Sequence, residues 1–413
     1  MNFLEYAIAA IRYDLFYDVL AALYFLAPLW VPLLLFVVFL NSWLTYIRMD
    51  YVLKQGFTVL EIKLPKEILK SPAAMEIVFT SLYQTGAVTE LDTYFRGKIR
   101  PWFSFEMVSF EGHVKFFVWT LLKWKDHIEA QIYGQYPTVE IHEVPDYTRD
   151  FQHDLSRWFM WITYFTFERP DVYPIKTYVD YGLDADPKEE HKIEPMASVL
   201  EYLGSLRKGE YAWIQILIQA HKKEKFKDGR IIPKPDWTVE AKAEIEKIRK
   251  ESIIQPESEG AFPLMAPTKG QQDTIAAIER SILKFPFECA IRGAYIAKNE
   301  SMNPIHINGL IGTFRQYSSP NLNGFKLGVF TDFDYPWQDF RRIRRTHREK
   351  EFLEAYKLRS FFQPPFKNFD QTPIILTTEE LATIYHFPGS AVQTPTFDRI
   401  PSKKAEPPAN LPI

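Results

Sequence analysis

The sequence of 413 residues is 46% hydrophobic and 24% charged, which excludes a mostly disordered chain and predicts two or three domains. A single cysteine excludes an intramolecular disulfide, and a net charge of −3 gives no overall attraction to nucleic acid. A mean hydropathy of −0.20 excludes a multispanning transporter.

Residues 19–47 contain no charged side chain. About 20 apolar residues span a bilayer, so this run predicts a transmembrane helix, preceded by a short amphipathic leader over 1–18. A cleaved signal peptide fits poorly, because a basic region before the run and a small-residue cleavage site after it are both missing. Basic residues lie mostly after the helix, which predicts that the C-terminal part is cytoplasmic, at the inner membrane: Arg48, Lys54, Lys63, Lys66 and Lys70.

Residues 57–148 show the order of patterns of one ferredoxin-like unit, strand-helix-strand-strand-helix-strand. Alternating apolar residues predict strands, and helical spacing predicts one helix around Met75–Tyr83 and another around Trp124–Tyr136. Glu111-Gly112 predicts a hairpin turn. The four predicted strands are 57–64, 103–110, 113–121 and 138–144.

A second ferredoxin-like unit is predicted over 165–335, with an insertion at 222–288 between its two central strands. Its predicted strands are 173–182, 210–221, 289–298 and 326–333, and its helices are 195–206 and a stretch near 303–317. The insertion carries a charged helix at 238–251 and another helix at 269–284. It is either a solvated helical excursion or a protruding docking element for a partner.

Residues 336–362 form a predicted basic helical linker. Its dense run of cations is either a solvated helix paired with neighbouring acids or a contact with nucleic-acid phosphates or anionic lipid headgroups. Without a sequence-reading motif, any DNA contact should be nonspecific. The cations are Arg341, Arg342, Arg344, Arg345, Arg348 and Lys350.

An extended proline-rich tail is predicted over 363–413, interrupted by a short helix at 378–386. Thr377 and Glu380 fit a capping box at the start of this helix. The apolar side of the helix must pack somewhere, either back onto the ferredoxin-like units or onto a separate ATPase. The residues of this side are Leu381, Ile384, Tyr385 and Phe387.

Several stretches taken in order resemble the region ahead of the ATPase domain in type IV secretion and conjugal-transfer ATPase-like membrane proteins of bacteria and archaea. These stretches are SPAAMEIVFTSLYQTG (71–86), PWFSFEMVSFEGHVKFFVW (101–119), IEAQIYGQYPTVEIHEVPDYT (128–148), LTTEELATIYHFPG (376–389) and KKAEPPANLP (403–412). The resemblance implies a membrane-anchored platform that leads into a RecA-like DNA-pumping motor.

The sequence departs from this family because it ends at Ile413 and contains no G-x-x-x-x-G-K-[ST] phosphate loop. No catalytic residue can be carried over, and we expect no cofactor. We expect a non-enzymatic scaffold that works with a separate ATPase, sits in the membrane by a single pass and forms an oligomer. The identity of the partner and of any transported substrate stays open.

A search for catalytic or metal-binding residues finds only weak candidates. His142 and Glu143 are consecutive in a predicted strand and should face opposite ways, His386 is interpreted as a packed surface histidine, and Cys289 as a buried inert thiol. Asp332 and Asp334 form a D-x-D after a predicted strand, which could hold a divalent metal on a nucleotide-sugar. The alternative function is therefore a membrane-anchored, metal-dependent glycosyltransferase.

Taken together, the sequence predicts an α+β protein: one N-terminal transmembrane helix, two ferredoxin-like units, a basic linker and a proline-rich tail.

Overall fold

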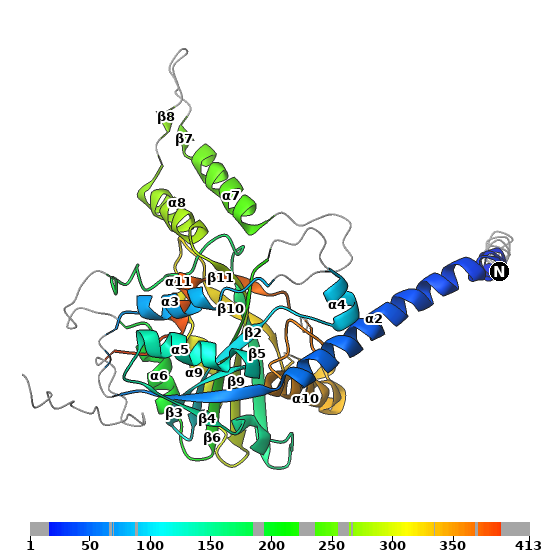
Figure 1. The fold of residues 1–413 in the computed structure, drawn as a ribbon, viewed down its shortest axis with the longest axis horizontal. Coiled ribbons are helices and arrows are strands. Elements are labelled where there is room, and N and C mark those ends of the chain that lie inside the picture. Colours follow the sequence, from blue (N-terminus) through cyan, green and yellow to red (C-terminus); the bar gives the residue numbers. More distant parts are fainter. Residues whose placement is uncertain are drawn as a thin grey trace, which may run out of the picture. The chain divides into compact units, whose positions relative to one another are not determined.

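A computed structural model describes residues 16–65, 68, 70–86, 90–184, 194–222, 236–254, 264–265, 267–333, 335–367 and 371–389 (Figure 1). These residues divide into two compact units. One comprises the described residues up to Lys54 together with 90–99, and the other comprises the rest. The predicted leader at 1–18 and the end of the predicted tail lie mostly outside the described residues.

The first unit contains an apolar helix near the N-terminus, as the charge-free run predicts. Helix Phe16–Phe25 is followed, after a turn at Leu26, by α2 (Ala27–Gln55). The break precedes Pro28, whose missing N–H is tolerated in the first turn of a helix. α2 is long and apolar enough to cross a membrane. The short helix α4 (Glu90–Arg96) belongs to the same unit.

The second unit is built on one nine-stranded sheet in which the described strand pairs are antiparallel. The strand order is β10-β5-β9-β6-β2-β3-β1-β4, and β11 adds to β9. The strands are β1 (Phe57–Lys63), β2 (Trp102–Phe110), β3 (His113–Leu121), β4 (Glu140–Val144), β5 (Trp158–Phe167), β6 (Glu210–Ala220), β9 (Pro286–Lys298), β10 (Phe325–Phe330) and β11 (Ile374–Thr377). The predicted turn between β2 and β3 is confirmed, with Glu111 and Gly112 both at positive φ.

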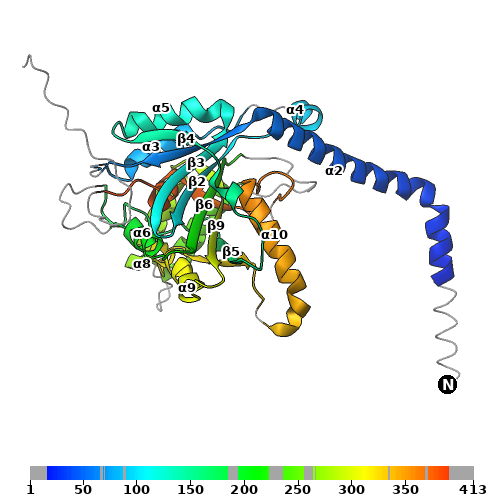
Figure 2. The same ribbon diagram turned by 90° about the horizontal axis from the view of Figure 1, so that it is seen from below.

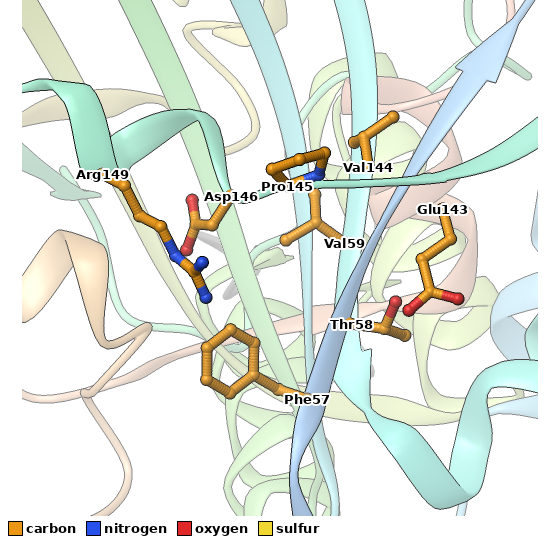
Figure 3. A pocket seen from close by; sticks show the side chains of 8 residues that line it. All are labelled: Phe57, Thr58, Val59, Glu143, Val144, Pro145, Asp146 and Arg149. Atoms are coloured by element: carbon orange, nitrogen blue, oxygen red, sulfur yellow. The ribbon is translucent and has the colours of Figure 1, made fainter.

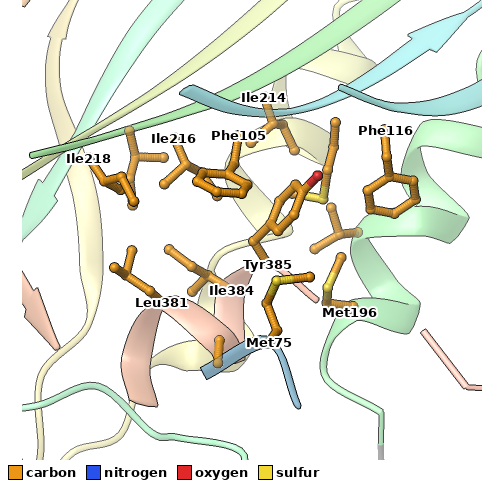
Figure 4. Packing of buried hydrophobic residues seen from close by; sticks show 14 of the residues in the cluster. Met75, Phe105, Phe116, Met196, Ile214, Ile216, Ile218, Leu381, Ile384 and Tyr385 are labelled. Atoms are coloured by element: carbon orange, nitrogen blue, oxygen red, sulfur yellow. The ribbon is translucent and has the colours of Figure 1, made fainter. Parts of the chain in front are cut away.

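Helices cover both faces of the sheet. The large hydrophobic core lies under α3 (Ala73–Ser81), α5 (Lys125–Gln135), α6 (Met196–Gly204), α9 (Ile305–Gly312) and α11 (Thr378–Ile384). Figure 4 shows this core around Tyr385 and Phe105, whose rings meet edge to face with centroids 5.1 Å apart. α10 (Ile343–Lys357) packs on the opposite face (Figure 2). There Tyr356 contacts Trp213 of β6.

The sequence analysis misplaces the first strand of the second half. Residues 173–182 are turns and irregular chain, and the strand is β5, at Trp158–Phe167. β5 is buried along nearly its whole length because helices cover both its faces, so its sequence shows no apolar–polar alternation. The second half therefore begins before residue 165. The two predicted units also share one sheet, through the pairing of β2 with β6.

The insertion forms a helical arm. α7 (Trp237–Glu251) and α8 (Lys269–Ile282) lie side by side and extend from the sheet unit, with the short strand pair β7 (Ile253–Ile254) and β8 (Leu264–Met265) at their far ends (Figure 1). Trp237, Ile245 and Ile278 form a small separate core between them. The arm begins close to the position that the charge pattern predicts.

The C-terminal part is not an extended tail up to Gly389. β11 joins the sheet, and α11 is buried against α3 and β2. The predicted capping box is confirmed, because Glu380 accepts hydrogen bonds from the backbone N–H and hydroxyl of Thr377. Residues 390–413, which hold most of the predicted proline-rich stretch, lie outside the described residues.

Candidate functional site

A polar row crosses the centre of the sheet on the face that α10 covers. Glu106 of β2 is paired in register with Gln215 of β6, which is paired with Arg292 of β9, which is paired with Tyr164 of β5. Successive side chains in a strand point to opposite faces, so the neighbours Phe105 and Met107 enter the hydrophobic core while Glu106 faces α10. Four adjacent strands thus place their polar residues in one line.

Arg359, just after α10, closes this row into an ionic network. Its guanidinium holds Glu106 through two hydrogen bonds, Nε to Oε1 at 2.9 Å and Nη2 to Oε2 at 3.0 Å. It also pairs with Asp146, which follows β4. The Arg359 and Glu106 side chains are both 0% exposed. We call Glu106, Asp146, Gln215, Arg292 and Arg359 the buried ionic network.

Hydroxyl, amide and backbone groups supply further hydrogen bonds to Glu106 and Arg292, although the Arg292 Nε has no hydrogen-bond partner among the described residues. Glu106 accepts hydrogen bonds from Ser104 at 2.6 Å, from Tyr147 at 2.7 Å and from the Gln215 amide at 2.9 Å. Arg292 donates to the Gln215 side chain at 2.8 Å, to the backbone oxygen of Ala355 at 2.8 Å and to that of Ser360. Since Ala355 lies in α10, the network fastens that helix to the sheet.

Burial governs the electrostatics of these groups. Burial alone would raise the pKa of Asp146, but the Arg359 guanidinium and hydrogen bonds from Thr148 outweigh it and hold the pKa below its usual value. Burial lowers the pKa of Arg292. Burial also opposes the charge of Arg359, but Glu106 and other partners raise the pKa of Arg359 well above its usual value. Arg359 is therefore a permanent cation inside the protein.

This geometry suits a structural lock rather than a reacting centre. Glu106 and Arg359 are sealed from solvent, and neighbouring groups already engage both of their charged ends.

A small pocket of about 350 Å³ opens at the edge of the buried ionic network (Figure 3). It is lined by residues of β1, the end of β4 and the turn that follows: Phe57, Thr58, Val59, Glu143, Val144, Pro145, Asp146 and Arg149. Asp146 is held by Arg359 and Thr148, and Glu143 pairs with Lys125. Arg149 is exposed and carries the pocket's positive charge. The pocket is thus lined by two carboxylates, each already paired, and one exposed guanidinium.

The predicted basic run does not behave as one patch. Arg345 turns inward to Asp332 at 3.0 Å and to Glu349 at 2.8 Å, and Arg348 donates to the backbone oxygen of Phe330 at 3.1 Å. Arg344 donates to the backbone oxygen of Gln338 at 3.0 Å. Four cations of the run are exposed: Arg341, Arg342, Arg344 and Lys350. They lie beside exposed apolar residues, with Trp337 at 77%, Phe340 at 72% and Ile343 at 63% exposure.

Of the two D-x-D aspartates, the structure describes Asp332 alone. Asp332 pairs with Arg345 and accepts a hydrogen bond from the backbone N–H of Phe333, while Asp334 lies outside the described residues. Within the described part of the chain, no cluster of three His, Cys, Asp or Glu side chains is placed to hold a metal ion.

The other single residues have clear surroundings. His142 lies near Glu140, while the neighbouring Glu143 pairs with Lys125. His386 is not a surface residue, because it is 1% exposed and contacts Glu194 at 2.7 Å and the Ala382 backbone oxygen at 2.8 Å. Cys289 is buried, and burial raises the pKa of its thiol well above the usual value.

Of the two alternatives for the tail helix, packing onto the sheet unit or docking onto a separate ATPase, the structure has the first. The four residues of the predicted apolar side are at most 1% exposed and belong to the core: Leu381, Ile384, Tyr385 and Phe387.

Glu380 gives stability an unusual pH dependence. Burial raises its pKa to about 7, although hydrogen bonds from Thr377 and Ile175 favour the charged form. A carboxyl with a raised folded-state pKa binds its proton more tightly when folded, so its contribution to stability is lost as pH rises through about 7.

Glu380→Gln should therefore gain stability relative to the wild type, by about 2–4 kcal/mol, between pH 4.5 and pH 8. Urea unfolding of the detergent-solubilised chain at both pH values measures this difference. Taking the difference between variant and wild type removes the contribution of other groups, such as Asp146. Parallel pH profiles would show that Glu380 stays ionised in the folded protein.

Sequence reasoning missed the buried ionic network. Its members lie on strands and turns more than 30 residues apart in the chain, and only the register brings Glu106, Gln215 and Arg292 together. One signal was available: Glu106 and Arg292 are charged residues in the middle of mostly apolar strands, which points to a buried partner.

Comparison with curated protein sequences finds no match. A family model does match residues 60–400, from within β1 through both halves of the sheet and past α11. The chain therefore belongs to the family described as Domain of unknown function (DUF8128).

Proposed function

We propose that this protein is a non-enzymatic, membrane-tethered scaffold of a type IV secretion-like or DNA-transfer machine and works with a RecA-like ATPase. The observation that carries the proposal is the connection between α2 and the sheet. α2 ends at Gln55 and β1 begins at Phe57, so only Gly56 separates an apolar helix from a large antiparallel sheet. The resemblance of five stretches to secretion ATPase-like proteins supplies the choice of machine.

The dimensions of α2 support a membrane span. Its uncharged part, residues 27–47, is about 31 Å long at 1.5 Å per residue, close to the roughly 30 Å of a hydrocarbon core. Trp43 and Tyr46 near its end suit the aromatic belt at the membrane surface, and Arg48 follows them. The excess of Lys and Arg after the helix supports an inner-membrane location with the sheet unit in the cytoplasm.

We also infer that the sheet unit consists of two ferredoxin-like units joined edge to edge. Apart from α4 in the first half and the arm in the second, each half has the order β-α-β-β-α-β. The spatial orders β4-β1-β3-β2 and β10-β5-β9-β6 correspond strand for strand. The equivalent strands β2 and β6 meet at the centre. Such duplicated sheets present edges and connecting segments for assembly, which suits an oligomeric scaffold.

The helical arm is the better candidate for docking the ATPase, since the tail helix is buried. The arm extends from the sheet, and its exposed apolar residues include Val239 at 53% and Leu283 at 84%. The exposed cations Arg341, Arg342 and Lys350 form a second candidate contact, for phosphates of nonspecifically bound nucleic acid or of anionic lipids.

The glycosyltransferase alternative gains no support from the structure. Ligands of doubly wound nucleotide-binding folds sit at the carboxyl ends of parallel strands, and the described strand pairs here are antiparallel. Asp332 is already paired with Arg345.

Capture of the ATPase tests the proposal. The full-length protein, solubilised from carbonate-washed membranes, should co-purify with a RecA-like ATPase encoded beside it. Val239→Lys combined with Leu283→Lys should abolish this capture, because each change replaces an exposed apolar side chain of the arm with a charge. Ile305→Lys, at a residue 72% exposed on α9, is the matched control and should leave capture intact. Equal capture by all three proteins would contradict docking through the arm, and absence of capture by the wild type would contradict the scaffold.

A further inference from the structure

Helix α4 lies against the end of the apolar helix α2. The Trp43 indole Nε1 donates a hydrogen bond to the backbone oxygen of Tyr94 at 3.0 Å. Gly97 comes even closer: a Cβ at this position would lie 2.3 Å from the backbone oxygen of Ile47. The side chains of Trp43 and Ile47 belong to the last uncharged turns of α2. α4 is therefore packed at the level where the proposed span ends.

This short helix exposes an unusual amount of apolar surface. Leu91 is 71%, Tyr94 49% and Phe95 70% exposed, so nearly half of its seven residues are large, apolar and open. Nearby charges are engaged with one another, because Asp92 forms salt bridges with both Arg96 and Lys98, each at 3.2 Å. Apolar area left in water costs about 25 cal/mol per Å², so such a surface calls for a covering environment.

We propose that α4 is a membrane-interface helix, with Leu91, Tyr94 and Phe95 inserted at the boundary between lipid headgroups and acyl chains. The proposal rests on the membrane placement of α2 proposed above. The occupant of this surface is the bilayer itself, because Tyr94 of α4 accepts a hydrogen bond from Trp43 and Gly97 contacts the backbone of Ile47, both at the aromatic end of the span. Arg96, which is 72% exposed at its side chain, can reach the headgroup phosphates.

The path of the chain gives this contact a role. The chain leaves the sheet unit after α3, forms α4 in the unit of α2, and returns to the sheet at Arg100 before β2. The sheet unit is thus connected to the membrane unit at Lys54–Gln55 and again on both sides of α4. A membrane-bound α4 supplies a second anchorage for the sheet unit besides α2.

Lipid quenching of a fluorescent probe tests the proposal on the full chain in bilayer nanodiscs. Phe95→Cys carries an environment-sensitive label, and the native Cys289, which is 0% exposed, is not expected to react. Brominated lipids should quench the probe at residue 95 several-fold more than a probe on Leu283→Cys, an exposed site on the arm. Equal quenching at the two sites would overturn the proposal.

A pair of glycine variants adds a test of the contact with α2. Gly97→Ala and Gly182→Ala both place a side chain at positive φ, +62° and +70°, but a Cβ at Gly182 would meet no atom within 4 Å. Gly97→Ala should therefore displace α4 and reduce quenching at residue 95, whereas Gly182→Ala should not. Unchanged quenching in Gly97→Ala would overturn the proposed positioning of α4. Carbonate extraction distinguishes the proposed span of α2 from the proposed insertion of α4. Release of the full-length protein from membranes would contradict the span. Retention of the protein together with an unquenched probe at residue 95 would contradict the insertion of α4 alone.

Discussion

Replacing Arg359 by methionine is expected to lower the free energy of unfolding by about 3–5 kcal/mol, the range for removing one partner of a buried ion pair. The variant would leave Glu106 buried beside Asp146 without their shared cation. The cost is a large part of the roughly 5–15 kcal/mol that keeps a typical domain folded. Chemical unfolding of the detergent-solubilised chain, followed by tryptophan fluorescence, measures the change.

Arg341→Met is the matched control. Arg341 also has a positive φ, 56° against 48° for Arg359, so both variants place the same side chain in the same backbone region. Arg341 is exposed, and its replacement should change stability by less than about 0.5 kcal/mol. In the double variant Glu106→Gln, Arg359→Met, part of the loss should be recovered because one uncompensated charge is gone. A loss for Arg359→Met as small as for Arg341→Met would show that the buried ionic network contributes little.

The sequence predicts well those helices and strands that bury one face and leave the other polar. In β1, β2 and β3, every second side chain enters the hydrophobic core, so their sequences show an alternating pattern. Their predicted limits agree with the observed ones within one residue. α7 and α8 carry an apolar stripe on a polar helix, and their predicted limits agree with the observed ones within two residues. The charge-free run predicts the apolar helix but not its start at Ala27, because the break depends on local geometry around Pro28.

Elements buried on all sides resist the same reasoning. β5 is apolar on both faces, so its sequence lacks the apolar–polar alternation that indicates a strand. Residues 173–182 show a more regular pattern and are therefore predicted as the strand instead. α11 reads as an amphipathic helix with a free apolar side, yet even its polar residues Glu379 and Glu380 are 3% exposed. Their partners, among them Thr177 and Arg280, lie about 100 or 200 residues away in the chain. Contacts over such separations are set by topology and not by local pattern.

Ending the chain after Pro373 is expected to prevent stable folding of the sheet unit. The truncation removes β11, which pairs with the start of β9, and α11, which packs on α3. It also removes the apolar side chains of Ile374, Leu376, Leu381, Ile384, Tyr385 and Phe387 from the core. At about 1.5–3 kcal/mol for each fully buried apolar side chain, the loss is on the order of 10 kcal/mol.

A chain ending after Gly389 is the matched control, because it keeps the contacts of β11 and α11 that the structure describes. The two truncations differ by only 16 residues, 374–389, so they separate core packing from docking. Core packing predicts that the shorter chain aggregates or loses its cooperative unfolding transition, while the longer chain retains the transition. Had α11 been a docking element, the shorter chain would unfold like the longer one and would fail only to bind its partner. A cooperative transition of unchanged midpoint in the shorter chain would therefore contradict the packing of α11 against Phe105 and Phe116, and would return the tail helix to the list of partner-binding elements.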